Sequence, residues 1–303
     1  MTQDRAVRVE APTERSNPRT KDIDLLPTLD VLRVLNAEDR TVPEAVSRAL
    51  PEVAQAVDLA VDTLRAGGRV HYVGAGTSGR LAVLDAAELV PTFNAPPDWF
   101  VAHQAGGEEA FVRAVENAED DTDSGAAVIR RHASSADFVM GLAASGRTPF
   151  VLAALREAKQ LGARTALLTS NPDPGDVPAD IVIAVDTGPE PIAGSTRMKA
   201  GTAQKLVLNS FSTAVMIRLG RTYSNLMVSM LATNAKLRGR TLSILQEATG
   251  AGDEECAAAL NSAGGDLKVA LVHLLSGVDT ERAAAALRET DGHVRQALDL
   301  VGA

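Results

Sequence analysis

Residues 69–88, with the sequence RVHYVGAGTSGRLAVLDAAE, decide the fold class of this chain. They begin with a short apolar run typical of a buried strand, continue through a glycine-rich turn, and end in the apolar spacing of a helix. Gly74 and Gly76 allow the backbone to turn tightly, and Thr77 and Ser78 bring hydroxyl groups to the start of the helix. Backbone N–H groups and the helix dipole favour an anion at that position by about 0.3–1 kcal/mol. The segment therefore predicts an anion-binding turn between a strand and a helix.

The spacing of Gly74, Gly76 and Gly79 also matches the dinucleotide fingerprint G-x-G-x-x-G. That fingerprint requires an acidic residue about 20 residues on, at the carboxyl end of the second strand. The second expected strand, residues 99–105, instead has Asp98 at its opposite end. A nucleoside triphosphate loop does not fit either, because no Lys-Ser or Lys-Thr pair follows the glycines. A phosphate monoester is the favoured ligand, with a nucleotide or a tight turn without a ligand as alternatives.

Composition limits the classes of partner. The 303 residues suffice for one large α/β domain with a smaller appendage, or for two modest domains. Hydrophobic residues make up 45% of the chain and aromatic residues only 3%, so Ala, Val and Leu must fill most of the core. A formal net charge of −9 argues against non-specific binding to nucleic acid or to an anionic membrane, because both require a basic surface.

Cysteine content and hydropathy indicate the cellular compartment. The single cysteine, Cys256, excludes an internal disulfide and fits a reducing compartment, and we expect it to be a small buried residue rather than a catalytic one. Residues 1–20 contain no apolar stretch of the signal-peptide type, and the chain has no run of 18 apolar residues. We therefore expect a soluble, cytoplasmic protein.

Strand and helix patterns alternate through the middle of the chain, which predicts an α/β fold with a doubly wound, mostly parallel sheet. Two helices precede it, at residues 28–36 and 43–66, and Gly67 and Gly68 end the second. The expected strands are residues 69–74, 99–105, 137–144, 164–169 and 181–186. The expected helices among them are residues 78–88, 107–131 and 149–161.

The last third of the chain changes character. Two long helices are expected at residues 196–220 and 224–236, and beyond Arg240 the strand signals vanish. Short helical pieces broken by glycines then predict a small bundle of three to five helices, which serves docking, dimer support or simple packing. The expected division is an N-terminal arm with its helices at 1–66, a main ligand-binding domain at 67–238 and the bundle at 239–303.

Three loops share one chemistry, at residues 74–80, 144–149 and 194–199. Each places small residues, hydroxyl groups and a cation beside the start of a helix, and ligands of open α/β sheets bind beyond the carboxyl ends of the strands. A single such loop is more often only a helix cap, worth about 1 kcal/mol. Together the three favour a phosphorylated, hydroxyl-rich ligand. The candidate binding residues are Thr77, Ser78, Ser145, Arg147, Thr148, Ser195, Thr196 and Lys199.

Two carboxylates stand out as candidates for acid–base work. Glu88 lies in the apolar segment LDAAELV, which would favour its protonated form, although an ordinary helix-end carboxylate is an equal alternative. Glu119 lies in the cluster ENAEDD, whose members are more often solvated or capping groups, and the sequence alone does not rank them. We expect no metal and no cofactor, because the five histidines show no paired ligand spacing and residues 120–123 lack the features of a calcium loop.

Several long strings resemble one family. The segments GAGTSGRLAVLDAAE with PTF, AGGEEAFVRAVENAEDD, ASGRTPFV, GSTRMKAGTAQKLVLN and NLMVSMLATNAKL are closely similar to those of the N-acetylmuramic acid 6-phosphate etherases, enzymes of the sugar isomerase (SIS) fold. The resemblance begins near Thr13, in TERSNPRTKDID, and continues to the C-terminus.

The resemblance implies cleavage of the ether that links D-lactate to C3 of the sugar, by elimination and then addition of water, without a metal. Matched by motif, Glu88 corresponds to the acid that protonates the departing lactate oxygen, and Glu119 to the base that removes the C2 proton. The chemistry requires two carboxyl groups in opposite protonation states. We expect Glu119 to be ionised and Glu88 to be protonated in the substrate complex.

Spacing along the helix suggests how the site is assembled. Ser78 and Glu88 are ten residues apart, a rise of about 15 Å on one straight helix, which exceeds the distance from phosphorus to C3 in a hexose phosphate. Either other loops hold the phosphate, or Glu88 serves a site completed by a second subunit, so we expect a homodimer with shared active sites. The alternatives are a non-catalytic sugar-phosphate-binding regulator, like the glucokinase regulatory protein, and an aldose–ketose isomerase.

Overall fold

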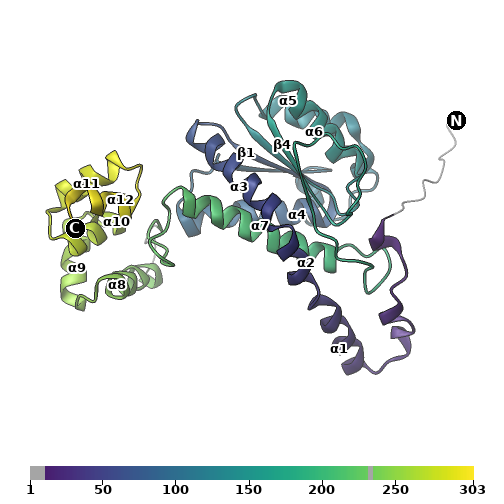
Figure 1. The fold of residues 1–303 in the computed structure, drawn as a ribbon, viewed down its shortest axis with the longest axis horizontal. Helices are drawn as coiled ribbons and strands as arrows, with labels where there is room; N and C mark the ends of the chain where they lie inside the picture. Colours follow the sequence, from purple (N-terminus) through teal and green to yellow (C-terminus); the bar gives the residue numbers. More distant parts are fainter. Residues whose placement is uncertain (1–10, 231–234) are drawn as a thin grey trace. The chain divides into compact units, whose positions relative to one another are not determined.

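The computed structural model describes residues 11–230 and 235–303 (Figure 1). The chain forms two compact units. The first comprises the chain up to residue 86 together with residues 98–211, and the second comprises residues 87–97 and 212–303.

A five-stranded parallel sheet forms the centre of the first unit, which confirms the predicted fold class. Its strands are β1 (Val70–Gly74), β2 (Phe100–Gln104), β3 (Phe138–Leu142), β4 (Arg164–Thr169) and β5 (Ile181–Ala184). Each begins and ends within two residues of its expected bounds. The spatial order is β2-β1-β3-β4-β5, so Val70 of β1 pairs with Phe100 on one side and with Phe138 on the other.

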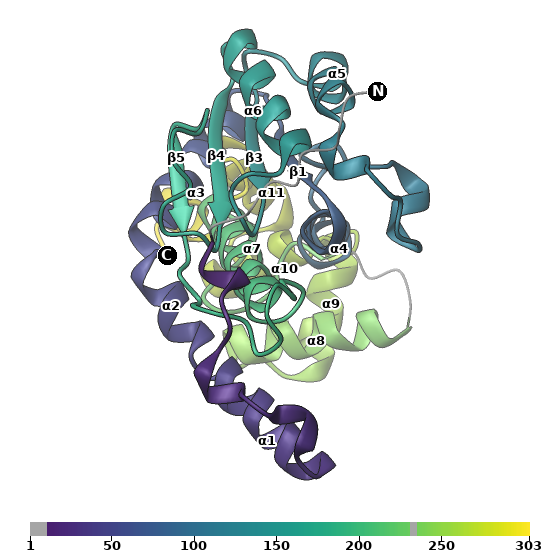
Figure 2. The same ribbon diagram turned by 90° about the vertical axis from the view of Figure 1, so that its right-hand side faces the viewer.

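Helices cover both faces of this sheet (Figures 1 and 2). Those of the first unit are α1 (Thr28–Asp39), α2 (Val42–Arg48), α3 (Leu50–Arg65), α4 (Gly76–Phe93), α5 (Thr122–His132), α6 (Pro149–Leu161) and α7 (Lys199–Arg218), the ends of α4 and α7 continuing into the second unit. Helices α5 and α6 lie on one face, and α3 and α7 on the other. Both faces of β1 and β3 are therefore buried, as expected for strands with continuous apolar runs.

The few aromatic residues are concentrated in the core of the first unit. Tyr72, Phe100 and Phe138 come from three strands and meet Phe211 of α7, with ring centroids 5.6–6.4 Å apart. The phenol of Tyr72 donates to Asp85 Oδ2 at 3.0 Å, so its polar end is satisfied inside the core. On the opposite face, Val, Leu and Ala side chains of the strands and α6 form the second layer.

The long helix expected at residues 107–131 is wrong over its first half. Two short 3-10 turns, Glu108–Phe111 and Ala118–Asp120, precede α5. The backbone has positive φ at Gly106, Gly107 and Asn117, which is incompatible with a continuous right-handed helix. Helix α5 begins only after Asp121, whose side chain accepts the N–H of Ser124.

The helix expected at residues 224–236 is also wrong in part. Tyr223 and Leu226 form an isolated antiparallel bridge, Ser224 has a φ of 51°, and no helix occurs between residues 224 and 230. Residues 231–234 of the predicted helix lie outside the described residues. The apolar side chains that suggested a helix instead pack in irregular backbone, with Val228 and Met230 in the core of the second unit.

The second unit contains the expected helical bundle. Five helices follow residue 234: α8 (Ala235–Thr249), α9 (Asp253–Ser262), α10 (Leu267–Ser276), α11 (Thr280–Glu289) and α12 (Val294–Val301). Their breaks fall at the predicted glycines, and Cys256 is buried in their common core. The expected border between residues 238 and 239 falls inside α8. Among the helices of the described residues, none has the length and hydropathy that a membrane crossing requires.

Candidate active site

The strand order identifies where a ligand would bind. The chain leaves β1 for β2 on one side and then crosses to β3 on the other side of β1. In open α/β sheets ligands bind beyond the carboxyl ends of the strands at such a switch point. The loops that follow β1 and β3 contain residues 74–80 and 144–149, so two of the three predicted ligand loops flank this point.

A pocket of about 190 Å³ lies at the carboxyl ends of β1 and β2, and Glu119 lines it. Other parts of its wall are Gly76 at the start of α4, Gln104 at the end of β2, and Asn117. Asn117 has a left-handed backbone, with a φ of 60°, immediately before the short turn that carries Glu119. The sequence could not rank the acidic cluster, and the structure brings Glu119 and Glu116 of that cluster to the pocket.

Arg80 holds the loop that carries this acidic cluster. Its guanidinium donates through Nε to the carbonyl oxygen of Phe111 at 3.1 Å and through Nη2 to that of Arg113 at 3.0 Å. The segment between β2 and α5 is thereby tied to α4 one turn after the glycine-rich turn. This cation therefore has a structural role besides lining the pocket.

Gln104 is a pocket residue that the sequence reasoning missed. Its side chain is 8% exposed, and its Oε1 has no hydrogen-bond partner among the described residues. A Cβ atom at Gly79 would lie 1.7 Å from this oxygen, so the third glycine of the motif makes room for the glutamine side chain. The available signal was its position as the last residue of β2, where side chains reach a ligand site.

The loop after β3 leads into α6 without a side-chain cap at the start of that helix. Thr148 precedes α6 and its side chain makes no capping hydrogen bond, so the first N–H groups of this helix have no cap from it. Ser145 Oγ accepts the N–H of Arg147 at 3.2 Å, and Asn171 donates to the carbonyl oxygen of Ser145 at 3.1 Å. Gly146 turns with a φ of 72°. The start of α6 is thus a helix N-terminus without a side-chain cap, a position that favours an anion, and Asn171 supports the loop from the end of β4.

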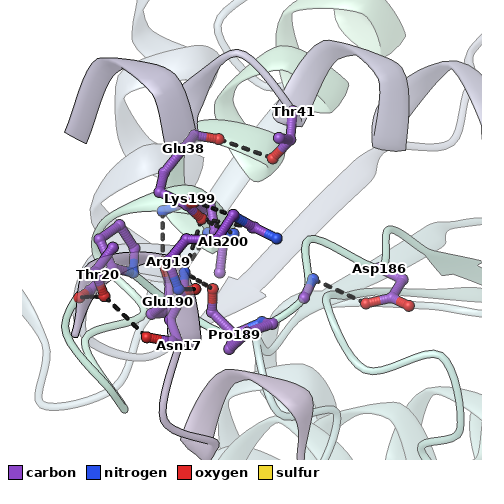
Figure 3. Close-up of polar contacts among 12 residues, drawn as sticks. Asn17, Arg19, Thr20, Glu38, Thr41, Asp186, Pro189, Glu190, Lys199 and Ala200 are labelled. Carbon is purple, nitrogen blue, oxygen red and sulfur yellow. Dashed lines mark hydrogen bonds and ion pairs between the residues drawn. The ribbon is translucent and has the colours of Figure 1, made fainter. Parts of the chain in front are cut away.

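In the third predicted loop, residues 194–199, Lys199 was expected to bind the ligand, but its side chain faces the protein interior (Figure 3). The side chain of Lys199 is fully buried, and its ammonium lies 2.9 Å from Glu38 Oε2. Glu190, also buried, accepts the N–H groups of Lys199 at 2.9 Å and Ala200 at 3.0 Å, so a carboxylate of the protein itself occupies the N-terminus of α7. Burial raises the pKa of Glu190. Lys199 therefore has a structural partner and leaves the set of candidate ligand donors.

The remaining residues of the first and third loops lie close together. A Cβ atom at Gly201 would be 3.4 Å from both the Thr196 carbonyl oxygen and the Thr77 methyl group, so the starts of α4 and α7 are adjacent. Ser78 is buried and donates to Gln204 Oε1 of α7 at 2.8 Å. Ser195, Thr196 and Thr77 are half-buried.

Glu88 lies on α4 in the second compact unit and is exposed. Its apolar neighbours Leu84 and Val90 are 43% and 40% exposed. Of the apolar residues that the sequence placed around Glu88, Leu89 is thus buried, whereas Leu84 and Val90 are exposed together with the carboxylate.

A buried histidine pair lies within the same sheet. His71 Nδ1 is 2.9 Å from His103 Nε2, and His71 Nε2 is 3.5 Å from Asp137 Oδ2. Burial lowers the pKa of His71 to about 4 and that of His103 to about 3, so both rings are neutral near pH 7. Within the described residues, no cluster of three or more His, Cys, Asp or Glu side chains is arranged to hold a metal ion.

Sequence comparison identifies the family of the chain. An N-acetylmuramic acid 6-phosphate etherase of Thermobifida fusca (strain YX) is 61% identical over 269 residues, which are 88% of this chain and 88% of the relative. Its counterpart in Serratia proteamaculans (strain 568) is 49% identical over 289 residues, 94% of this chain and 97% of the relative. The chain belongs to the N-acetylmuramic acid 6-phosphate etherase family.

A domain profile also matches part of this etherase family member. The profile of the glucokinase regulatory protein N-terminal SIS domain matches residues 52–159, which include β1, α4, β2 and β3. Among solved structures, a phosphoheptose isomerase from Francisella tularensis is similar with a TM-score of 0.48 and 21% identity, over 63% of this chain and 98% of that chain. The match to the SIS-domain profile and the five-stranded parallel sheet confirm the SIS-like fold inferred from the sequence.

Proposed function

We propose that this protein is an enzyme that cleaves the D-lactyl ether of N-acetylmuramic acid 6-phosphate, giving N-acetylglucosamine 6-phosphate and D-lactate. The observation that carries the proposal is the 61% identity to an etherase over 88% of the chain, in a protein that has both Glu88 and Glu119. The pocket that Glu119 lines together with Gly76 and Arg80 of the loop after β1 supports it. A regulator that only binds sugar phosphate would not need either carboxylate.

The proposed reaction begins with the open-chain aldehyde form of the sugar, in which C1 makes the C2 proton acidic. Glu119 removes this proton. The electron pair forms the C2–C3 double bond as the bond from C3 to the ether oxygen breaks, and Glu88 protonates that oxygen so that lactate leaves. Water then adds to C3 of the unsaturated aldehyde, with its proton returning to C2. Each acid–base role contributes typically 10²- to 10⁴-fold to the rate.

The phosphate and hydroxyl groups of the substrate require donors, which the three loops supply in this proposal. The N-terminus of α6, with Ser145, Arg147 and Thr148, is the preferred phosphate site, because it combines a helix start without a side-chain cap, hydroxyl groups and a cation. Thr77, Ser195 and Thr196 complete the set. Ser78 acts through its hydrogen bond to Gln204.

We further propose that the enzyme is a homodimer in which Glu88 of one subunit completes the site of the other. Ser78 and Glu88 lie on the same helix, α4, with a rise of about 15 Å between them. Leu84 lies one turn before Glu88 on the same face of α4 and is exposed, so a second subunit that covered this face would supply the apolar surroundings that a carboxylic acid needs. We also propose that the enzyme is cytoplasmic and takes part in the recycling of cell-wall amino sugars, which fits its charged substrate.

Incubation of the protein with N-acetylmuramic acid 6-phosphate tests the proposed function. D-lactate should appear, and in ¹⁸O-labelled water the label should enter C3 of the amino sugar and not the lactate, since water adds after the C3–oxygen bond breaks. An aldose–ketose isomerase would release no lactate, and a regulator would bind the sugar without changing it. Label in the lactate would contradict the elimination route.

A further inference from the structure

We propose that the N-terminal arm, residues 13–38, positions the substrate-binding loop at residues 189–199, with Glu38 and Thr20 as the positioning residues (Figure 3). This inference rests on the proposed function, because it assigns substrate contact to Ser195 and Thr196 of that loop. The arm thereby has a role in substrate affinity, in addition to the etherase reaction itself.

The arm and the loop meet at a buried carboxylate. Glu38 is 3% exposed near the end of α1. Its carboxylate accepts from Asn17 Nδ2 at 2.8 Å, from the guanidinium of Arg19, and from Lys199 Nζ at 2.9 Å. Arg19 reaches solvent, whereas Lys199 is fully buried, so Glu38 is the counter-charge that allows this ammonium to lie in the interior.

Neutral hydrogen bonds hold the loop at several points along its length. Asn17 Nδ2 donates to the carbonyl oxygen of Pro189 at 3.2 Å, and Thr20 Oγ1 donates to that of Pro191 at 2.7 Å. The N–H of Gly194 donates to the carbonyl oxygen of Thr13 at 2.9 Å, one residue before Ser195. The arm therefore contacts the start and the middle of the loop, and the ion pair of Lys199 holds its end.

The loop is also closed on itself. Glu190 caps the N-terminus of α7 by accepting from Lys199 and Ala200, so the chain returns to within hydrogen-bond distance of its own start. A loop fixed in this way presents Ser195 and Thr196 in one arrangement before the substrate arrives. Preorganisation of this kind lowers the entropy that binding must overcome, so its loss weakens substrate binding more than it slows the chemical step.

Thr20→Val tests the inference, because it removes the hydroxyl that reaches the loop and preserves the side-chain shape. Thr41→Val is the control, since Thr41 Oγ1 donates at 2.8 Å to the carbonyl oxygen of Glu38 and, among the described residues, makes no hydrogen bond to the loop. We expect Thr20→Val to raise KM for N-acetylmuramic acid 6-phosphate by about three- to tenfold with little change in kcat. Thr20→Ser, which keeps the hydroxyl, should restore the KM.

Amide hydrogen exchange gives a readout that does not depend on activity. Exchange at residues 189–199 should accelerate in Thr20→Val and in Glu38→Gln, and should be unchanged in Thr41→Val. The inference would be overturned if Thr20→Val and Thr41→Val changed the exchange of the loop equally, or if Thr20→Val left that exchange unchanged. If the wild-type protein releases no D-lactate, the proposed function fails, and the exchange measurement still decides whether the arm orders the loop.

Discussion

Glu119 lies at a pocket and is exposed, so its replacement tests the chemistry without removing core packing. Glu119→Gln should lower the rate of D-lactate release by at least about 100-fold, because an amide cannot take up the C2 proton. Asp120→Asn is the matched control, an exposed carboxylate on the same short turn, and should retain nearly the full rate. Equal losses in both variants would remove Glu119 from its assigned role.

The histidine pair predicts how stability depends on pH. In the folded protein the pKa of His71 is about 4 and that of His103 about 3, whereas an unfolded histidine titrates near 6.5. Between these values the unfolded chain binds more protons than the folded one, so the free energy of unfolding decreases as the pH falls below 6.5. The decrease is of the order of 1 kcal/mol per pH unit for each buried histidine.

Denaturant unfolding between pH 7 and pH 5 measures this dependence. Carboxylates contribute mainly at lower pH: the Arg19 guanidinium holds the pKa of Glu38 at about 2, so stability from Glu38 is lost only as the pH falls from about 4.5 toward 2. His71→Gln should flatten the slope between pH 7 and pH 5, whatever its effect on stability at pH 7. An unchanged slope would show that this histidine is not the titrating group.

Helices and strands were predicted best where the apolar residues of the sequence have a clear spacing. The parallel strands and helix α6 were predicted within two residues, because buried strands and amphipathic helices have clear apolar spacing. The helix expected at residues 107–131 failed because positive φ at Gly106, Gly107 and Asn117 overrides an apolar spacing. The segment 224–230 failed because its apolar residues pack into a core without regular structure.

Gly79 offers a test at the scale of the strand–turn–helix element. A Cβ atom there would lie 1.7 Å from Gln104 Oε1 and 2.8 Å from the backbone oxygen of Gly74, so Gly79→Ala should destabilise the protein despite the higher helix propensity of alanine. Gly239 of α8 has nothing within 4 Å of the same position, and Gly239→Ala should stabilise by about 0.5–1 kcal/mol. Thermal unfolding of the two variants should therefore shift in opposite directions.

At the scale of the whole molecule, shared active sites predict complementation between subunits. Glu88→Gln and Glu119→Gln proteins should each be inactive, but in a mixed dimer one of the two sites receives both native glutamates. Random reassembly makes half of the dimers mixed, so the mixture should recover about a quarter of the wild-type rate. Each variant unfolded and refolded alone provides the control. A mixture that stays inactive, although mass spectrometry detects mixed dimers, would place both glutamates in one chain.

The candidate site was predictable only in part. The sequence proposed three loops and two glutamates as candidates, and the structure places one of these glutamates, Glu119, at a pocket beside the start of α4. The sequence did not reveal that Lys199 pairs with Glu38, 161 positions away in the chain, or that Glu190 caps α7. A lysine beside serine and threonine at a helix start has the same local pattern whether its ammonium faces a ligand or a buried carboxylate.

The α/β class, the bounds of the strands and the chemical character of the loops follow from local sequence patterns, because they depend on apolar spacing and on glycine and hydroxyl residues within short windows. Three features required the folded chain: the strand order that places the loops of β1 and β3 at one switch point, the packing of Gln104 against Gly79, and the buried ion pair of Lys199. Each of these depends on contacts between residues far apart in the chain, and local periodicity carries no information about which distant segments meet.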